Sequence, residues 1–310
     1  MSTVKNYLSL IKFSHTIFAM PFALIGFCLG LVRLPGFIAN EVNTKMEVIT
    51  TSELMDLLVS QQLVGMKLLL VLLCMIFARS AAMAFNRYLD RKFDEKNPRT
   101  AIREIPAGII TPKNALAFTI INCLLFVAAT WFINPICFYL SPVALFVVLF
   151  YSYTKRFTAL CHLVLGVGLS LAPIGAYLAV TGVFNWLPLL FSFAVVFWVS
   201  GFDIIYALQD EEFDKNNQLH SVPAALGKSK ALRVSELLHL LSAAAVIAAG
   251  FYGSFGWLYW IGVAVFAGML IYQHSVVKPT DLRRVNLAFM TANGIASVVF
   301  AIFVILDIFI

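Results

Sequence analysis

The feature that most constrains this chain is a series of long apolar segments. Nine runs are each about 17 to 25 residues long, the length that an α-helix needs to cross the hydrocarbon core of a bilayer. They cover residues 13–34, 64–86, 115–133, 135–153, 159–180, 187–208, 234–252, 257–273 and 286–306. With 61% hydrophobic residues in 310 and a mean hydropathy of +0.90, the chain holds more apolar surface than a soluble domain could bury. The sequence therefore predicts an all-α polytopic membrane protein, a bundle of nine transmembrane helices.

The positions of Lys and Arg predict how these helices are oriented. The segments after the second, fourth, sixth and eighth predicted helices hold 16 of the 22 Lys and Arg residues, while those after the third, fifth and seventh hold none. Because short cytoplasmic loops are enriched in these residues, the pattern predicts an N-in, C-out arrangement with the charge-rich face in the cytoplasm. The same loops explain the net charge of +6, so no nucleic acid is expected as a partner. With little chain outside the apolar runs, residues 1–310 are interpreted as one membrane domain.

The acidic residues are concentrated in two regions of the chain. Nine of the 16 acids lie within 90–104 and 203–214. Segment 90–108 reads DRKFDEKN and later IPAG, while segment 210–227 reads DEEFDKNN and later VPAALG. This likeness indicates an internal repeat. It predicts two similar four-helix units, each delivering an acidic pair to the same membrane face, with one helix left over.

Helical spacing arranges these acids in stripes. The two stripes are Asn86, Asp90 and Asp94 on one helix, and Asp203, Asp210 and Asp214 on another. Stacked carboxylates repel one another, so the pattern is expected either among solvated charges beside a membrane or around a bound cation. Its occurrence twice on one predicted face favours the cation. Oxygen ligands suit Mg²⁺, which takes one or two carboxylates and completes its shell with water and substrate phosphate. The acids are therefore predicted to hold metal, and the metal to hold a diphosphate.

Basic residues near the acids fit a diphosphate. Arg87 and Arg91 lie beside the first stripe, and the loop YSYTKRF at 151–157 supplies Lys155 and Arg156, with Tyr151 one helical turn before the lysine. Lys acts as a point charge on phosphate oxygens, and Arg as a bidentate fork for phosphate or carboxylate. Alone, the Lys-Arg pair is equally consistent with a positive-inside anchor. Beside two acidic motifs, a phosphate-binding role is favoured.

Together these residues resemble the UbiA superfamily of intramembrane aromatic prenyltransferases. The first motif of that family, N-(D/R)-x-x-D-x-x-x-D, matches Asn86, Arg87, Asp90 and Asp94. The second, D-x-x-x-D, matches Asp210 and Asp214, and a Tyr-x-x-x-Lys element matches Tyr151 and Lys155. The likeness extends from FSHTIFAMPFALIG at 13–26 to the ninth predicted helix, and the combination of motifs is highly specific.

The resemblance implies a nine-helix bundle with a central apolar cavity, capped on the cytoplasmic side by the two acidic loops, in contact with membrane lipid in the bacterial inner membrane. It implies an enzyme that uses Mg²⁺ to bind a polyprenyl diphosphate and transfers the prenyl group to an aromatic acid acceptor of the 4-hydroxybenzoate type in quinone biosynthesis. The implied metal ligands are Asn86, Asp90, Asp94, Asp210 and Asp214. The implied substrate-binding residues are Asn86, Tyr151, Lys155, Arg156, Arg91 and Asp203, and the implied catalytic residues are Asp90, Asp94, Asp210, Asp214, Lys155 and Arg91.

Two alternatives stay open at this point. Position 87 is Arg where hydroxybenzoate enzymes of the family usually have Asp. The segment is closer to a branch associated with menaquinone precursors, so a dihydroxynaphthoate acceptor remains possible. Outside the family, internal repeats and intramembrane acids also mark secondary transporters. Acids gathered at one face instead of the membrane midplane favour the enzyme. The group that takes the ring proton, released diphosphate or Asp203, is also open.

The histidines and cysteines give weaker signals. His15, within the first apolar run, is either functional or hydrogen-bonded to a neighbouring backbone group. The other four, His162, His220, His239 and His274, show no pairing that suggests a metal and are interpreted as loop or interfacial residues. The five cysteines lack the spacing of a zinc site or a disulfide framework.

Overall fold

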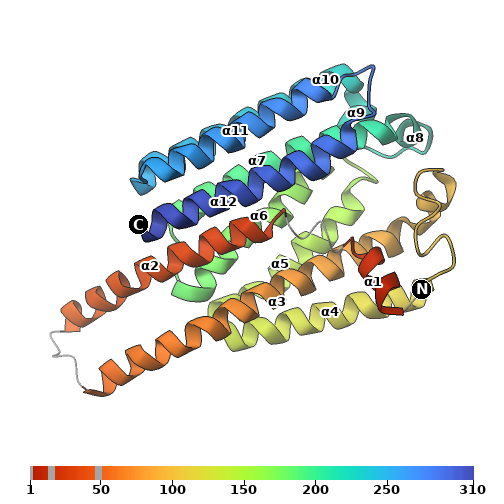
Figure 1. Cartoon of the computed structure of the whole chain (residues 1–310). Helices are drawn as coiled ribbons and strands as arrows, with labels where there is room; N and C mark the ends of the chain where they lie inside the picture. Colours follow the sequence, from red (N-terminus) through yellow and green to blue (C-terminus); the bar gives the residue numbers. More distant parts are fainter. Residues whose placement is uncertain (1–2, 13–17, 46–50) are drawn as a thin grey trace.

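The computed structural model describes residues 3–12, 18–45 and 51–310, with side chains for 4–12, 18–33 and 63–310. The described chain is a bundle of long helices that run side by side (Figure 1). The long helices are α2 (Met20–Lys45), α3 (Thr51–Lys96), α4 (Pro112–Ile133), α5 (Pro135–Thr154), α6 (Cys161–Thr181), α7 (Trp186–Ala207), α10 (Lys228–Gly253), α11 (Trp257–Val276) and α12 (Asn293–Phe309). The short elements are α1 (Thr3–Leu10), a 3₁₀ turn (Leu208–Asp210), α8 (Glu211–Asn216), α9 (Val222–Leu226) and a π-helical turn (Leu287–Ala292). His15 lies outside the described residues.

Eight helical segments of the described chain are long and apolar enough to cross a membrane. They coincide with eight of the nine predicted runs. The first predicted run, 13–34, begins outside the described residues, and its part from Met20 to Arg33 forms an apolar helix shorter than the other spans. The all-helical, multi-pass architecture is therefore confirmed. A ninth span and the N-in, C-out orientation remain predictions.

Local sequence sets the boundary between two of the spans. Asn134 precedes Pro135, and its side chain accepts a hydrogen bond from the N–H of Cys137. Such a cap satisfies one of the free donors in the first helical turn, and proline is well suited to that turn because its missing N–H has no helical partner there. Asn134 also donates to the carbonyl of Leu178 near the end of α6, at 2.8 Å. The Asn-Pro pair therefore ends α4, begins α5 and ties both to α6.

The two sides of the bundle are packed differently. Around α7, large rings fill the interior: Trp198 lies 5.4 Å from Phe22 of α2 and 5.9 Å from Phe266 of α11, measured between ring centroids. Between α3, α4, α5 and α6, small residues of α6 such as Gly168, Ala172 and Ala176 leave space. A cavity of about 370 Å³ with largely apolar walls lies there. Apolar side chains thus build a solid core on one side and a pocket on the other.

The same local arrangement occurs twice in the chain. Helix α3 carries the first acidic motif at its end and packs along α4, which follows it in sequence. Helix α7 leads into the second motif in the 3₁₀ turn and α8, and packs along α10. The loop after α3 and the segment around α8 lie at the same end of the bundle (Figure 1). The two acidic motifs therefore share one end of the molecule, as the repeat predicts.

Two details differ from the sequence-based expectation. The acids of the second motif do not continue the helix that carries Asp203, because α7 ends at Ala207 and a 3₁₀ turn intervenes before α8. The polar segment 34–63, between the first two predicted apolar runs, falls largely within the end of α2 and the beginning of α3. In the first place the helix ends before the acids that the stripe assigned to it, and in the second the helices continue beyond the predicted membrane spans.

Close approach of α6 and α7 gives a first prediction. A Cβ added at Gly166 would lie 2.4 Å from the carbonyl oxygen of Val196 and 2.5 Å from the Ser200 hydroxyl. We expect Gly166→Ala to lower stability by about 1–3 kcal/mol, the usual cost of overpacking. Thermal unfolding in detergent measures it. Gly168→Ala, two residues along the same helix, meets its nearest atom at 3.6 Å and serves as the control. Equal melting temperatures for both variants would contradict the prediction.

Candidate active site

The four motif carboxylates gather at one end of the bundle, each against a different basic side chain. The pairs are Asp90 with Arg156, Asp94 with Arg103, Asp210 with Arg99, and Asp214 with Lys155. Removing charges from water is costly unless they are paired. The pairing therefore lets a strongly charged cluster lie against an apolar bundle.

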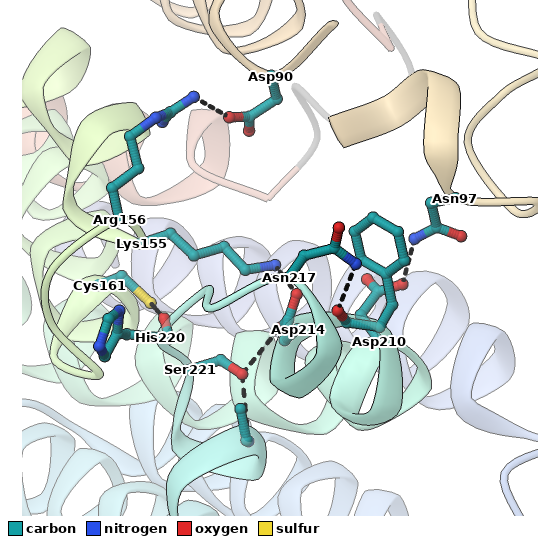
Figure 2. Close-up of polar contacts among 12 residues, drawn as sticks. Asp90, Asn97, Lys155, Arg156, Cys161, Asp210, Asp214, Asn217, His220 and Ser221 are labelled. Carbon is teal, nitrogen blue, oxygen red and sulfur yellow. Dashed lines mark hydrogen bonds and ion pairs between the residues drawn. The ribbon is translucent and has the colours of Figure 1, made fainter. Parts of the chain in front are cut away.

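Two consecutive residues join the two acidic motifs. After α5 ends, Arg156 donates to Asp90 Oδ1 of α3 at 2.8 Å, and Lys155 Nζ lies 2.7 Å from Asp214 Oδ1 of α8 (Figure 2). Arg156 is further held by the carbonyls of Leu89 and Ser152, at 3.1 and 2.9 Å. The predicted Lys-Arg pair thus lies between the motifs and contacts both.

Asp214 is fully buried, and its carboxylate determines the protonation state of its partner, Lys155. Burial alone would lower the pKa of Lys155, but Asp214, with Asp210 and Asp90, outweighs it and holds the pKa above its ordinary value. The lysine is therefore a cation at neutral pH. Ser221 donates to the other oxygen of Asp214 at 2.8 Å and also caps α9.

The loop after the first motif reaches the second motif directly. Asn97 Nδ2 donates to Asp210 Oδ1 at 3.2 Å (Figure 2). Arg99 Nε donates to the same oxygen at 3.0 Å. Arg99 also contacts the hydroxyl of Tyr206 at 3.0 Å. Burial lowers the pKa of Arg99, but Asp210 and Tyr206 raise it above its ordinary value. The two motifs, 120 residues apart, therefore form one site.

The first motif has two further features. Asn86 donates to Asp90 at 3.2 Å, as expected for residues one helical turn apart. Asp94 Oδ1 accepts a hydrogen bond from Arg103 at 2.6 Å, while its Oδ2 is buried and has no hydrogen-bond partner among the described residues. An unpartnered buried carboxylate oxygen is costly, so it is a natural position for a ligand.

The structure brings most of the predicted residues to this site. Those at the cluster are Asn86, Asp90, Asp94, Lys155, Arg156, Asp210 and Asp214. Tyr151 lies just below, in the cavity wall, where its hydroxyl interacts electrostatically with Asp90 and Asp203. Arg91 is different: its guanidinium donates to the carbonyl of Tyr88 at 2.6 Å and lies over that tyrosine ring, with no contact to either motif among the described residues.

Several residues of the site were not predicted from the sequence. Arg99 and Arg103 lie in the loop after α3. The path of a loop cannot be predicted from the periodicity of the sequence. Arg79 lines the cavity with its Nε buried and unpartnered. The sequence did contain a signal for Arg79, because a charged residue inside an apolar run such as 64–86 is often functional.

Two of the histidines interpreted as loop or interfacial residues, His162 and His239, are instead buried within helices. His162 is buried and its Nδ1 lies 2.7 Å from Asp203 Oδ2. His239 and His274 form a second pair at 2.9 Å between α10 and α11. Each pair joins residues on different helices, which spacing along one segment cannot show.

Comparison with known proteins assigns the chain to a family. The model of the UbiA prenyltransferase family matches residues 56–295. The chain belongs to this family. As a UbiA family member it is a prenyltransferase, and the transporter alternative is set aside.

Named relatives and solved structures agree with the UbiA assignment. The chain is 32% identical over 242 residues to a 4-hydroxybenzoate octaprenyltransferase of Tolumonas auensis, covering 76% of this chain and 82% of the relative. It is 30% identical to the protein of the same name from Nitrosospira multiformis, covering 76% and 80%. An apo structure of a UbiA homolog from Aeropyrum pernix superposes with a TM-score of 0.72 at 26% identity, over 95% of this chain and 97% of that one. A UbiA homolog from Archaeoglobus fulgidus bound to DMAPP and Mg²⁺ shares the fold, with a TM-score of 0.66 at 20% identity, over 98% and 99% of the two chains.

The Lys155–Asp214 pair gives a second prediction. Lys155→Met leaves a buried carboxylate without its cation and should lower stability by about 3 kcal/mol, the low end for breaking a buried pair, because the lysine is one-third exposed (33%). Adding Asp214→Asn should recover most of the loss in thermal unfolding. The surface pair of Lys215 and Glu211 is the control, and Lys215→Met should cost less than about 1 kcal/mol. A double variant no more stable than Lys155→Met would argue against the pairing.

Proposed function

We propose that this protein transfers a polyprenyl group from a polyprenyl diphosphate to 4-hydroxybenzoate or a closely similar aromatic acid. The observation that carries the proposal is the convergence of two acidic motifs and their basic partners directly above an apolar cavity with an arginine in its wall. Polar groups at one end suit a diphosphate, and the apolar cavity suits an isoprenoid tail. The relatives named as 4-hydroxybenzoate octaprenyltransferases support the same substrates.

The donor set at the cluster fits Mg²⁺. Side chains 4–12, 18–33 and 63–310 contain no preformed group of three His, Cys, Asp or Glu that could hold a metal ion. The motif side chains nevertheless offer carboxylate and amide oxygens as metal ligands. The unpartnered Oδ2 of Asp94 is a buried ligand atom of this kind. The proposed ligands are Asn86, Asp90, Asp94, Asp210 and Asp214. When bound, Mg²⁺ would neutralise charge on the diphosphate oxygens.

The basic side chains around the acids are placed to hold the diphosphate. Lys155, Arg156, Arg99 and Arg103 all lie within reach of motif carboxylates, so a diphosphate bound there would meet them too. These cations stabilise the negative charge that grows on the leaving group as the allylic C–O bond ionises. The allylic cation is then captured by the electron-rich ring of the acceptor.

The cavity accounts for the prenyl tail and the acceptor. Each tail CH₂ moved out of water is worth about 0.8 kcal/mol, and most of the cavity wall is apolar. Among the described residues that line the cavity, Arg79 is the charged one, and it lies near Tyr151. A lone cation in an apolar wall is suited to the carboxylate of an aromatic acid. The family resemblance implies that Arg91 and Arg156 hold either the diphosphate or the acceptor's carboxylate. For the carboxylate we favour Arg79, because it lies in the cavity wall.

The remaining parts of the proposal concern the whole chain. Residues 1–310 are proposed to form one membrane domain of the bacterial inner membrane, with the charged end of the bundle in the cytoplasm. The positive-inside distribution of Lys and Arg supports this side. Quinone biosynthesis is the proposed pathway class, supported by the names of the relatives.

A third prediction concerns the carboxylates. Asp90→Asn and Asp210→Asn should each lower kcat by about 10²–10³-fold, as for loss of one preorganised electrostatic group. Transfer of labelled 4-hydroxybenzoate into lipid-soluble product, with polyprenyl diphosphate and excess Mg²⁺, measures this. The matched controls are Glu95→Gln and Glu212→Gln, exposed neighbours that should retain activity. Near-normal turnover by the aspartate variants would refute the proposed site.

A fourth prediction concerns the acceptor. Arg79→Met should raise the KM for 4-hydroxybenzoate by about 10–100-fold, the worth of one hydrogen bond to a charged group, and leave prenyl diphosphate binding unchanged. The methyl ester of the acceptor has no carboxylate, so the wild type and the variant should use it equally. A dihydroxynaphthoate is tested in the same assay as a second acceptor. Selective prenyl transfer to it would show that the naphthoate, and not 4-hydroxybenzoate, is the acceptor.

A further inference from the structure

His162 and Asp203 form a buried pair that the site described above does not use. His162 is the second residue of α6 and is only 4% exposed, while Asp203 lies in the last two turns of α7. The imidazole Nδ1 lies 2.7 Å from Asp203 Oδ2. The hydroxyl oxygen of Ser200, one turn before the aspartate, lies 3.1 Å from the backbone carbonyl oxygen of His162, so the two helices are in close contact here. The pair is thus held by two helices of the bundle.

A backbone hydrogen bond fixes the tautomer of His162. The N–H of Val222, the first residue of α9, donates to His162 Nε2 at 3.3 Å. A backbone N–H is always a donor, so Nε2 must be the acceptor and carries no proton. The ring proton of the imidazole is therefore on Nδ1, and Nδ1 donates to Asp203. A neutral histidine that donates to a carboxylate in this way sets the orientation of the carboxylate.

Asp203 lies near both the cavity and the second motif. It precedes Asp210 by seven residues, and it is close enough to Tyr151 of the cavity wall to affect that hydroxyl electrostatically. The side chain of Asp203 is 25% exposed. His162 contacts only Oδ2, which leaves Oδ1 for a further hydrogen bond. The carboxylate therefore lies near the same tyrosine as Arg79, the residue proposed to hold the acceptor.

We propose that His162 is a positioning residue that orients Asp203 to take the proton released by the acceptor ring. This inference rests on the proposed function. In the reaction, the C–O bond between the prenyl group and the diphosphate breaks, and its electron pair leaves with the diphosphate oxygen. A C–C bond forms from the ring to the prenyl carbon. The ring C–H bond then breaks, its electrons restore aromaticity, and the proton goes to Asp203 Oδ1.

The alternative is that His162 only supports the fold. Its Nε2 anchors the beginning of α9, and neighbouring contacts pin the same segment: His220 N–H donates to the carbonyl of Lys155 at 2.7 Å, and the Cys161 thiol contacts the carbonyl of His220 at 3.5 Å (Figure 2). Loss of His162 could displace this segment and Asp214 with it. Two substitutions separate these roles. Asn places an amide N–H where Nδ1 is, whereas Gln places its amide near Nε2.

The fifth prediction uses ring-deuterated 4-hydroxybenzoate, with deuterium at the carbon that receives the prenyl group. We expect no primary isotope effect on kcat in the wild type. His162→Ala should lower kcat by about 100-fold, as for a misplaced acid-base group, and an isotope effect should appear because proton removal becomes slow. His162→Asn should retain kcat within about tenfold, the worth of the lost Val222 bond. His162→Gln should behave like the alanine variant. Mg²⁺-dependent binding of prenyl diphosphate should be the same in all of them.

Other outcomes separate the inference from the proposed function. Recovery by Gln and not Asn, or a rate loss without an isotope effect, would show that His162 only anchors α9 and would overturn the inference while the prenyltransferase assignment stands. Weakened diphosphate binding in His162→Ala would have the same meaning. Absence of transfer by the wild type to any aromatic acid would overturn the proposed function, and this inference with it.

Discussion

The structure depends on the pairing of four carboxylates with four cations at one end of an apolar bundle. A single buried charge at this position would cost several kcal/mol, so each motif acid has a basic partner. Three of the four partners come from parts of the chain far from the acids they contact: Arg99 follows the first motif and binds the second, while Lys155 and Arg156 follow α5 and bind one motif each. Charge neutralisation therefore assembles the two repeated halves into one site.

The contrast between the two sides of the bundle gives this charged end its chemical setting. Rings such as Trp198, Phe22 and Phe266 fill the side around α7, so little can enter there. Small residues of α6 leave the cavity on the other side, next to Tyr151. A diphosphate bound to the charged cluster would therefore have an apolar space beside it on one side only. The fold would thus set the direction of a bound substrate as well as its position.

Sequence reasoning reached as far as patterns within single segments allow. The apolar runs located eight spans, and the repeated Asp-x-x-Phe-Asp-x-x-Asn placed two acidic motifs together because identical local structure delivers identical groups to one face. It missed Arg99 and Arg103 because a loop path is set by tertiary contacts. It misread His162 because its partner, Asp203, lies on another helix. Arg91 was assigned by its place beside the motif, but in the structure its guanidinium contacts Tyr88 of its own helix.

The turn between α5 and α6 holds two cations that are adjacent in sequence and bind different halves of the protein. Adding or deleting one residue between Tyr151 and Cys161 would move both side chains out of register with their acids at once. The connection is therefore intolerant of length change in a way that most surface turns are not. A family member with a longer turn at this place would need another way to hold its halves together.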